Sequence, residues 1–201
     1  HIAQSMSNIE GFEGKDFGNF FGFKSFLKEN LANFIVGRGL ISKQQIHEIM
    51  DYYGDIPFSW KINKKDQELI QNAIESGLKE DITYYEMIVK KEDFSKLISP
   101  DIQIIRVNEA YGFNKWIELF NGFYGNKFQI LSILLEKVYN HSKEFKFFIA
   151  VMNRIPVGCC YVYESTNIIE VSSLIVNKNY TNRGIATTML SLIIDLGFSG
   201  S

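Results

Sequence analysis

The amino-acid sequence predicts an α/β fold of the α+β type, in which a mixed, mainly antiparallel sheet is flanked by helices. After residue 100, strand-like and helical segments follow one another in the order strand, two helices, three strands joined by short turns, helix. Before residue 100 the pattern is helix-rich with two strands. A charged segment that Pro100 closes separates these patterns, so we expect two regions, residues 1–100 and 101–201.

In the first region, apolar residues at helical spacing predict a helix over residues 23–36 that ends at Gly37. Ser42 is a candidate N-cap for a second helix, which ends near Gly54. The other elements expected here are a strand over 57–62, a helix with Leu69, Ile70, Ala73 and Ile74 on one face, and a strand over 82–89.

The second region has a different pattern of predicted helices and strands. Its expected elements, in order, are a strand over 102–107, helices over 113–123 and 128–139, strands over 145–151, 156–163 and 168–176, and a helix from about Gly184. Asn153 suits the positive φ that the turn between the second and third of these strands demands.

Composition disfavours several classes of function. The chain has 201 residues, 46% of them apolar and 22% charged, with a net charge of −2. That balance gives no field to attract nucleic acid or an anionic membrane, so we expect neither partner. Cys159 and Cys160 are neighbours on a predicted strand and point to opposite faces, which indicates buried free thiols, a reducing compartment and a cytoplasmic location. No cysteine or histidine spacing fits a metal site, so we expect no metal.

The segment from Ile169 to Ala186 carries the clearest chemical signal. It reads as a buried strand, a tight turn and the first turn of a helix. A helix start leaves N–H donors free and favours negative charge. Gly184 has no Cβ, so a phosphate could approach the backbone closely, and Arg183 adds a positive charge. The pattern lacks the Lys-Ser/Thr of a Walker loop and the three glycines of a dinucleotide fingerprint.

At this point the chain resembles the GNAT acyltransferase superfamily, over about residues 101–198. That family's signature, Gln/Arg-x-x-Gly-x-Gly/Ala directly after its fourth strand, appears here as Thr181-Asn182-Arg183-Gly184-Ile185-Ala186. Gly184 and Ala186 match, whereas Thr181 departs from the pattern. The hairpin of Phe147–Val151 and Pro156–Gly158 also looks like the family's.

The resemblance implies an acetyl-CoA-dependent N-acetyltransferase, in which an amine attacks the thioester directly. It implies Glu170 as the general base; the alternative is a solvated strand-edge residue or an ion-pair partner. The backbone N–H near Leu174 would stabilise the oxyanion, and the backbone of Val176 would pair with the pantetheine arm. The pyrophosphate would be held by Asn182, Arg183, Gly184, Ile185 and Ala186.

In the family, a fifth strand, a helix and a final strand pair follow the helix that starts at Gly184, and none of these precedes Ser201. We therefore expect a truncated acyltransferase, or alternatively a non-catalytic regulatory or interaction domain with a degenerate acyltransferase fold. The edge of the strand 168–176 would be open to a second chain, which makes a homodimer a further expectation.

Overall fold

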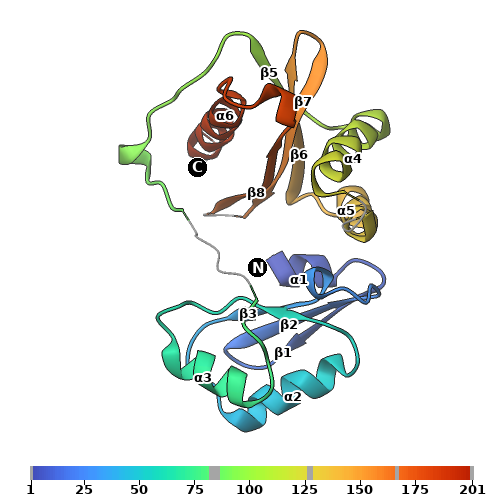
Figure 1. Ribbon diagram of the computed structural model, residues 1–201, viewed down its shortest axis with the longest axis vertical. Coiled ribbons are helices and arrows are strands. Elements are labelled where there is room, and N and C mark those ends of the chain that lie inside the picture. The colour runs from blue at the N-terminus through green and yellow to red at the C-terminus, as the bar shows by residue number, and fades with distance from the viewer. Residues whose placement is uncertain (1, 82–86, 126–128, 166–167, 200–201) are drawn as a thin grey trace. The chain divides into compact units, whose positions relative to one another are not determined.

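The computed structural model describes residues 2–81, 87–125, 129–165 and 168–199. Its contacts divide the chain into two compact units, His1–Glu86 and Met87–Ser201 (Figure 1). Each unit has its own four-stranded sheet and its own hydrophobic core, so each is described separately.

The sheet of the first unit has the strand order β1-β2-β3-β4, antiparallel except for the parallel pair β3 and β4. Helix α1 packs on β1 and β2 next to Gly14, whereas α2 covers the opposite face next to Gly22 (Figure 1). In chain order the elements are α1 (Ile2–Ser7), β1 (Phe12–Asp16), β2 (Phe20–Ser25), β3 (Phe34–Gly37), α2 (Lys43–Tyr53), β4 (Ser59–Trp60) and α3 (Gln67–Glu75).

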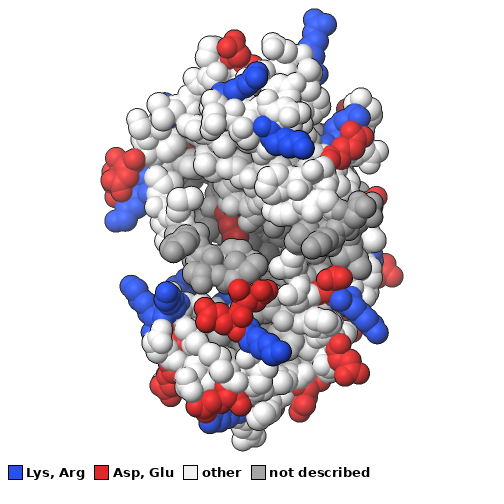
Figure 2. All heavy atoms as spheres, viewed as in Figure 1, with Lys and Arg blue, Asp and Glu red and all other residues white. Residues whose placement is uncertain are grey.

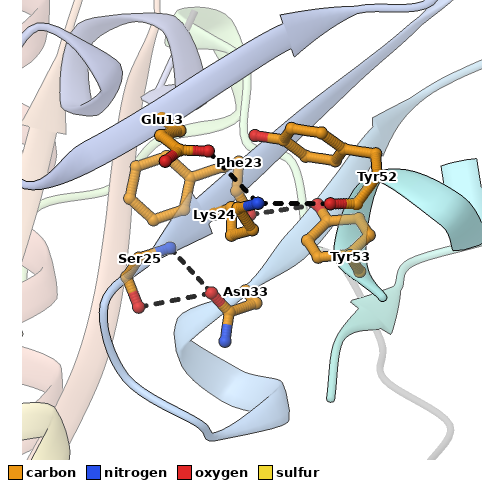
Figure 3. Close-up of polar contacts among 7 residues, drawn as sticks. All are labelled: Glu13, Phe23, Lys24, Ser25, Asn33, Tyr52 and Tyr53. Carbon is orange, nitrogen blue, oxygen red and sulfur yellow. Dashed lines mark hydrogen bonds and ion pairs between the residues drawn. The ribbon is translucent and has the colours of Figure 1, made fainter. Parts of the chain in front are cut away.

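A polar network ties the β2–β3 connection to the rest of this unit (Figure 3). Asn33 is fully buried; its Oδ1 accepts the N–H of Ser25 at 2.7 Å, and its Nδ2 donates to the carbonyls of Leu27 at 2.7 Å and Glu29 at 2.8 Å. The hydroxyl of Tyr53, from α2, reaches the carbonyl oxygen of Phe23 on β2 at 3.0 Å. A buried polar group is tolerated when it is bonded in this way, so the network is structural.

The helix predicted over residues 23–36 is wrong. The segment contains the end of β2, a 3₁₀ turn (Asn30–Ala32) and the start of β3. Phe26 and Leu31, which would have formed the buried stripe, are 48% and 42% exposed. Pairing of β2 with β1 and β3 instead buries Phe20, Phe23 and Ile35, because strand pairing outweighs a chance helical spacing.

The later predictions for this unit fare better. Helix α2 is confirmed, with Ser42 as its N-cap: the Ser42 hydroxyl accepts the N–H of Gln45 at 3.2 Å, and the Gln45 side chain accepts the N–H of Ser42 at 3.1 Å. The short strand β4 and the helix α3 are also confirmed. Of the strand expected over 82–89, residues 82–86 lie outside the described residues, and 87–89 form no strand.

The second unit has a fully antiparallel sheet with the order β5-β6-β7-β8. Helix α6 packs on one face, and α4 and α5 on the other (Figure 1). All predicted elements after residue 100 are confirmed: β5 (Ile102–Arg106), α4 (Ala110–Tyr124), α5 (Gln129–His141), β6 (Phe145–Met152), β7 (Ile155–Glu164), β8 (Ile169–Val176) and α6 (Ile185–Ser199).

Two details of this sheet were also foreseen. The β6–β7 turn has positive φ at Asn153 (52°) and Arg154 (66°), the combination that a tight hairpin turn requires. Cys159 and Cys160 are buried free thiols, and burial raises the pKa of both, so they remain protonated at neutral pH.

A strap of residues 94–99 precedes β5 and runs along α6. The N–H of Leu97 donates to the Ser191 hydroxyl and that of Ser99 to the Thr188 hydroxyl, both at 3.1 Å. Lys96 pairs with Asp195. These partners lie three or four residues apart on α6, so one face of the helix binds the strap.

On the face shown in Figure 2, neither acidic nor basic side chains predominate. Figure 2 shows acidic and basic side chains interspersed over each unit there. Among the helices of the described residues, none is long and apolar enough to cross a membrane.

Candidate functional site

Strand β8 contains a bulge. Gly158 and Cys159 of β7 face Val176 and Ile175, but Tyr161 faces Ser172, so Ser173 and Leu174 together lie opposite Cys160. Ser173 has φ = 50°, a left-handed conformation that non-glycine residues rarely adopt. A bulge bends a strand and changes where its groups point, and bulges are common next to active sites.

The bulge follows from the order of apolar residues. In a regular strand alternate residues share a face, so Val171 and Leu174 would lie on opposite faces. The extra residue changes this parity, and both pack against the core that α6 covers, as do Ile169 and Val176. Burial of all four apolar side chains therefore offsets the local strain at Ser173.

Helix α4 fixes β7 at the level of the bulge. The indole N–H of Trp116, which is fully buried, donates to the carbonyl oxygen of Cys160 at 2.8 Å. Cys160 is the residue that faces the bulge. A buried hydrogen bond of this kind is costly to break, so the indole holds this part of the strand in place.

Polar side chains gather on the α4 side of β8. Glu170 is exposed, and its Oε1 accepts a hydrogen bond from the Ser172 hydroxyl at 3.2 Å. Ser172 lies directly opposite Tyr161. The pKa of Tyr161 is raised, mainly by burial; the charge of Glu170 and the nearby Tyr124 raise it further, whereas hydrogen bonds with Ser172 and Ser173 oppose the rise.

The turn after β8 leads the backbone into a helix start. Asn182 (φ = 60°) and Gly184 (φ = 76°) are both left-handed. The first helical hydrogen bond runs from the N–H of Thr188 to the carbonyl of Gly184 at 2.9 Å. The backbone N–H groups of Ile185, Ala186 and Thr187 therefore have no helical carbonyl four residues earlier to bond to. Together with the helix dipole, these N–H groups favour an anion at the start of α6.

There is free space in front of this helix start. A Cβ built on Gly184 would meet no atom within 4 Å. Asn182 and Arg183 are exposed, and the guanidinium carbon of Arg183 lies 5.3 Å from the ring centroid of Tyr180. A ligand could approach the backbone without displacing a side chain.

Gly158 lets α6 approach the sheet. A Cβ at this position would lie 2.8 Å from the carbonyl oxygen of Ile175, 3.3 Å from Ile185 and 3.4 Å from Met189. Ile185 is buried in the core under the sheet. The close contact therefore sets the position of the helix start relative to the end of β8.

The structure brings together some of the residues singled out in the sequence and separates others. Leu174, Val176 and Ile185 pack against one core, so their backbones lie near the end of β8 and the start of α6. Glu170 is on the opposite face, before the bulge. Strand β8 is an edge strand among the described strands, so its outer backbone groups face away from the sheet.

The sequence did not predict the contacts in this region, namely the hydrogen bond of Ser172 to Glu170, the position of Tyr161 opposite Ser172, the bond of Trp116 to Cys160 and the bulge at Ser173. The break in apolar alternation between Val171 and Leu174 was a signal for the bulge. No group of three potential metal ligands occurs in the part of the chain that the structure describes. A hollow of about 560 Å³ in the first unit, lined in part by Asp16, Asn19 and Arg38, contains none of the predicted site residues.

Comparison with known proteins relates this site to an enzyme family. Residues 113–200 match the model of the acetyltransferase (GNAT) family. Curated proteins yield no match. Among solved structures, a GCN5-related N-acetyltransferase from Kribbella flavida is 12% identical with a TM-score of 0.63; the match covers 98% of this chain and 79% of that one.

Two other structures illustrate the range. A functionally unknown conserved protein from Staphylococcus epidermidis is 13% identical with a TM-score of 0.59, covering 94% of this chain and 80% of that one. An aminoglycoside acetyltransferase from an uncultured soil metagenomic sample is 24% identical with a TM-score of 0.42, covering 50% and 72%. The family-model match spans α4 to α6, which is most of the second unit, and the Kribbella flavida structure shares its fold.

Proposed function

We propose that this protein is an N-acetyltransferase that moves an acetyl group from acetyl-CoA to an amine. The observation that supports this most is the helix start after β8, where free amide donors, a left-handed Gly184 and open space occur together within the segment that matches the family. These features suit a pyrophosphate, which carries negative charge and needs several N–H donors.

The remaining binding roles use backbone groups. The side chains of Leu174 and Val176 pack on the core, so their main-chain groups are what they offer to a ligand. We assign the pantetheine arm to the open edge of β8 beside Val176, because an extended chain can add to a sheet edge as a strand does. The N–H of Leu174, next to the bulge, would donate to the thioester oxygen as negative charge develops on it.

Glu170 is the proposed general base. The amine nitrogen attacks the carbonyl carbon of the thioester, its proton passes to the Glu170 carboxylate directly or through water, and the C–S bond breaks to release the thiol of CoA after protonation. Exposure of Glu170 supports this role, because an acceptor amine can reach an exposed carboxylate.

A non-catalytic binding domain is the second candidate. Thr181 occupies the first position of the phosphate-binding signature, and its hydroxyl donates to the carbonyl of Lys178 at 3.2 Å. That hydroxyl is used inside the turn, which reduces what the position can give to a phosphate. This candidate predicts that acetyl-CoA binds without turnover with any amine.

Titration calorimetry of the protein with acetyl-CoA tests the proposal first. We expect saturable binding with one site per chain. A thiol-release assay over a panel of primary amines then separates the two candidates, because an enzyme releases CoA and a binding domain does not. Absence of acetyl-CoA binding would contradict both.

A further inference from the structure

We propose that Ser172 and Tyr161 are positioning residues, which hold the Glu170 carboxylate through a directed chain of hydroxyl groups. The inference rests on the proposed function, in which Glu170 acts as the base. Neither residue belongs to the signature that identifies the phosphate-binding turn.

The first link is the hydrogen bond from the Ser172 hydroxyl to Oε1 of Glu170 at 3.2 Å. The two residues are separated by one position on β8, before the bulge, and so share a face of the strand. An exposed glutamate has three rotatable bonds and samples several rotamers in water. A donor fixed on the same strand restricts that sampling.

The second link is Tyr161. It lies directly across from Ser172 in the β7–β8 register, where facing Cβ atoms are about 5 Å apart. Its ring is held by aromatic neighbours, with centroid distances of 5.9 Å to Phe147 and 6.4 Å to Trp116. Trp116 is itself fixed by its bond to the Cys160 carbonyl, so the phenol has a rigid base.

The direction of the chain follows from counting protons. A serine hydroxyl has one proton, and Ser172 gives it to Glu170, so a further partner of Ser172 must donate to its oxygen. The pKa of Tyr161 is raised, mainly by burial, so the phenol stays protonated and able to donate at neutral pH. Hydrogen-bonded chains of this kind strengthen each member.

The groups that face the phenol come from two elements. Glu170, Ser172 and Ser173 belong to β8, and Tyr124 is in the last turn of α4. Ser173 starts the bulge, so the row of hydroxyl groups ends where the regular β7–β8 pairing ends. The carboxylate is therefore held on the same strand as the proposed oxyanion donor, four residues before the N–H of Leu174.

The decisive experiment needs no substrate. The protein is labelled with ¹³C at the tyrosine ring, Tyr161 is assigned by loss of its signal in Tyr161→Phe, and its titration is followed by NMR. We expect Glu170→Gln to lower the pKa of Tyr161, because a negative charge is removed. Ser172→Ala should raise it, because the Ser172 hydroxyl, which can turn from Glu170 to donate to the phenolate once Tyr161 ionises, is lost. Two titrations that match the wild type would overturn the proposal.

Control variants guard against indirect effects. Ser165→Ala removes a hydroxyl from the turn before β8 and should leave the titration unchanged. Ser172→Thr keeps the hydroxyl and should restore wild-type behaviour if Ser172→Ala folds poorly. A Ser172→Thr protein that titrates like Ser172→Ala would also overturn the proposal.

A kinetic experiment then tests the consequence for catalysis. Ser172→Ala and Tyr161→Phe should each lower kcat roughly fivefold, as expected for loss of one hydrogen bond, and leave the KM for acetyl-CoA unchanged. The double variant should lose little more than either single one, because the residues act in series. Unchanged kcat in both single variants would overturn the proposal. Absence of turnover in the wild type would instead contradict the proposed function, and the NMR titration would still decide the hydroxyl chain.

Discussion

In the first unit, Asn33 is fully buried and both ends of its amide are bonded to backbone groups of its own loop. In the second unit, the amides of Ile185 and Ala186 begin a helix behind an uncrowded, left-handed Gly184. The first arrangement uses polar groups internally and leaves nothing for a ligand. The second leaves amide donors without a helical partner, and that difference separates a structural network from the proposed binding site.

The largest effect should come from breaking the network of the first unit. Asn33→Ala leaves the N–H of Ser25 and the carbonyls of Leu27 and Glu29 without their partner, so we expect a loss of about 3 kcal/mol in the free energy of unfolding. Urea unfolding followed through NMR signals of this unit measures it. The exposed Asn140→Ala is the matched control. Equal free energies of unfolding for the two variants would show that the hydrogen bonds of Asn33 do not stabilise the first unit.

The next effect concerns how α6 is placed. Gly158→Ala would put a Cβ 2.8 Å from the carbonyl oxygen of Ile175, so we expect a loss of about 2 kcal/mol from overpacking. Gly122→Ala, in α4, has no atom within 4 Å of its new Cβ and should instead stabilise the protein by about 0.5 kcal/mol. Thermal unfolding of both variants gives the sign of each change. A stable Gly158→Ala protein would mean that α6 can move away freely.

A matched pair of glycines separates strain from ligand binding. Gly184 (φ = 76°) and Gly18 (φ = 82°) are both left-handed with no atom near a built Cβ, so alanine at either should cost about 1 kcal/mol in stability. We expect only Gly184→Ala to weaken acetyl-CoA binding, about tenfold, because its Cβ would occupy the space proposed for phosphate. Calorimetry on both variants checks this. Equal acetyl-CoA affinities of the two variants would show that the start of α6 does not bind the cofactor.

The smallest effect is a pH dependence of the first unit. Burial, and then the charge of Glu13, raises the pKa of Tyr52 to about 12. In the unfolded chain, the Tyr52 phenol ionises near pH 10. The stability that the neutral phenol contributes is therefore complete below pH 10 and is lost as the pH rises towards 12. Tyr52→Phe should weaken the loss of stability between pH 9 and 11 in urea unfolding. An unchanged slope would contradict the assignment.

The same comparison explains what the sequence could predict. In the second unit, each element is marked by local apolar periodicity, and its helices and strands follow the predicted order. In the first unit, β1, β2 and β3 form through pairings that local spacing does not report. Phe23 and Ile35 belong to different strands, and the helical spacing between them was accidental.

The candidate site divides in the same way. The turn at Asn182 and Gly184 could be located from residue types, because helix starts and small residues leave a local mark. The pairing of Tyr161 with Ser172 depends on the β7–β8 register, which the bulge shifts by one residue. Side chains that meet across a shifted register cannot be paired from one strand's pattern alone.

The most direct test is to titrate the ¹⁵N-labelled protein with acetyl-CoA and to map the amide shifts by NMR. We predict that the largest shifts fall on Leu174, Gly184, Ile185 and Ala186, while amides bonded to Asn33, such as that of Ser25, stay in place. Saturable shifts centred on the first unit, or no shifts at the start of α6, would contradict the account.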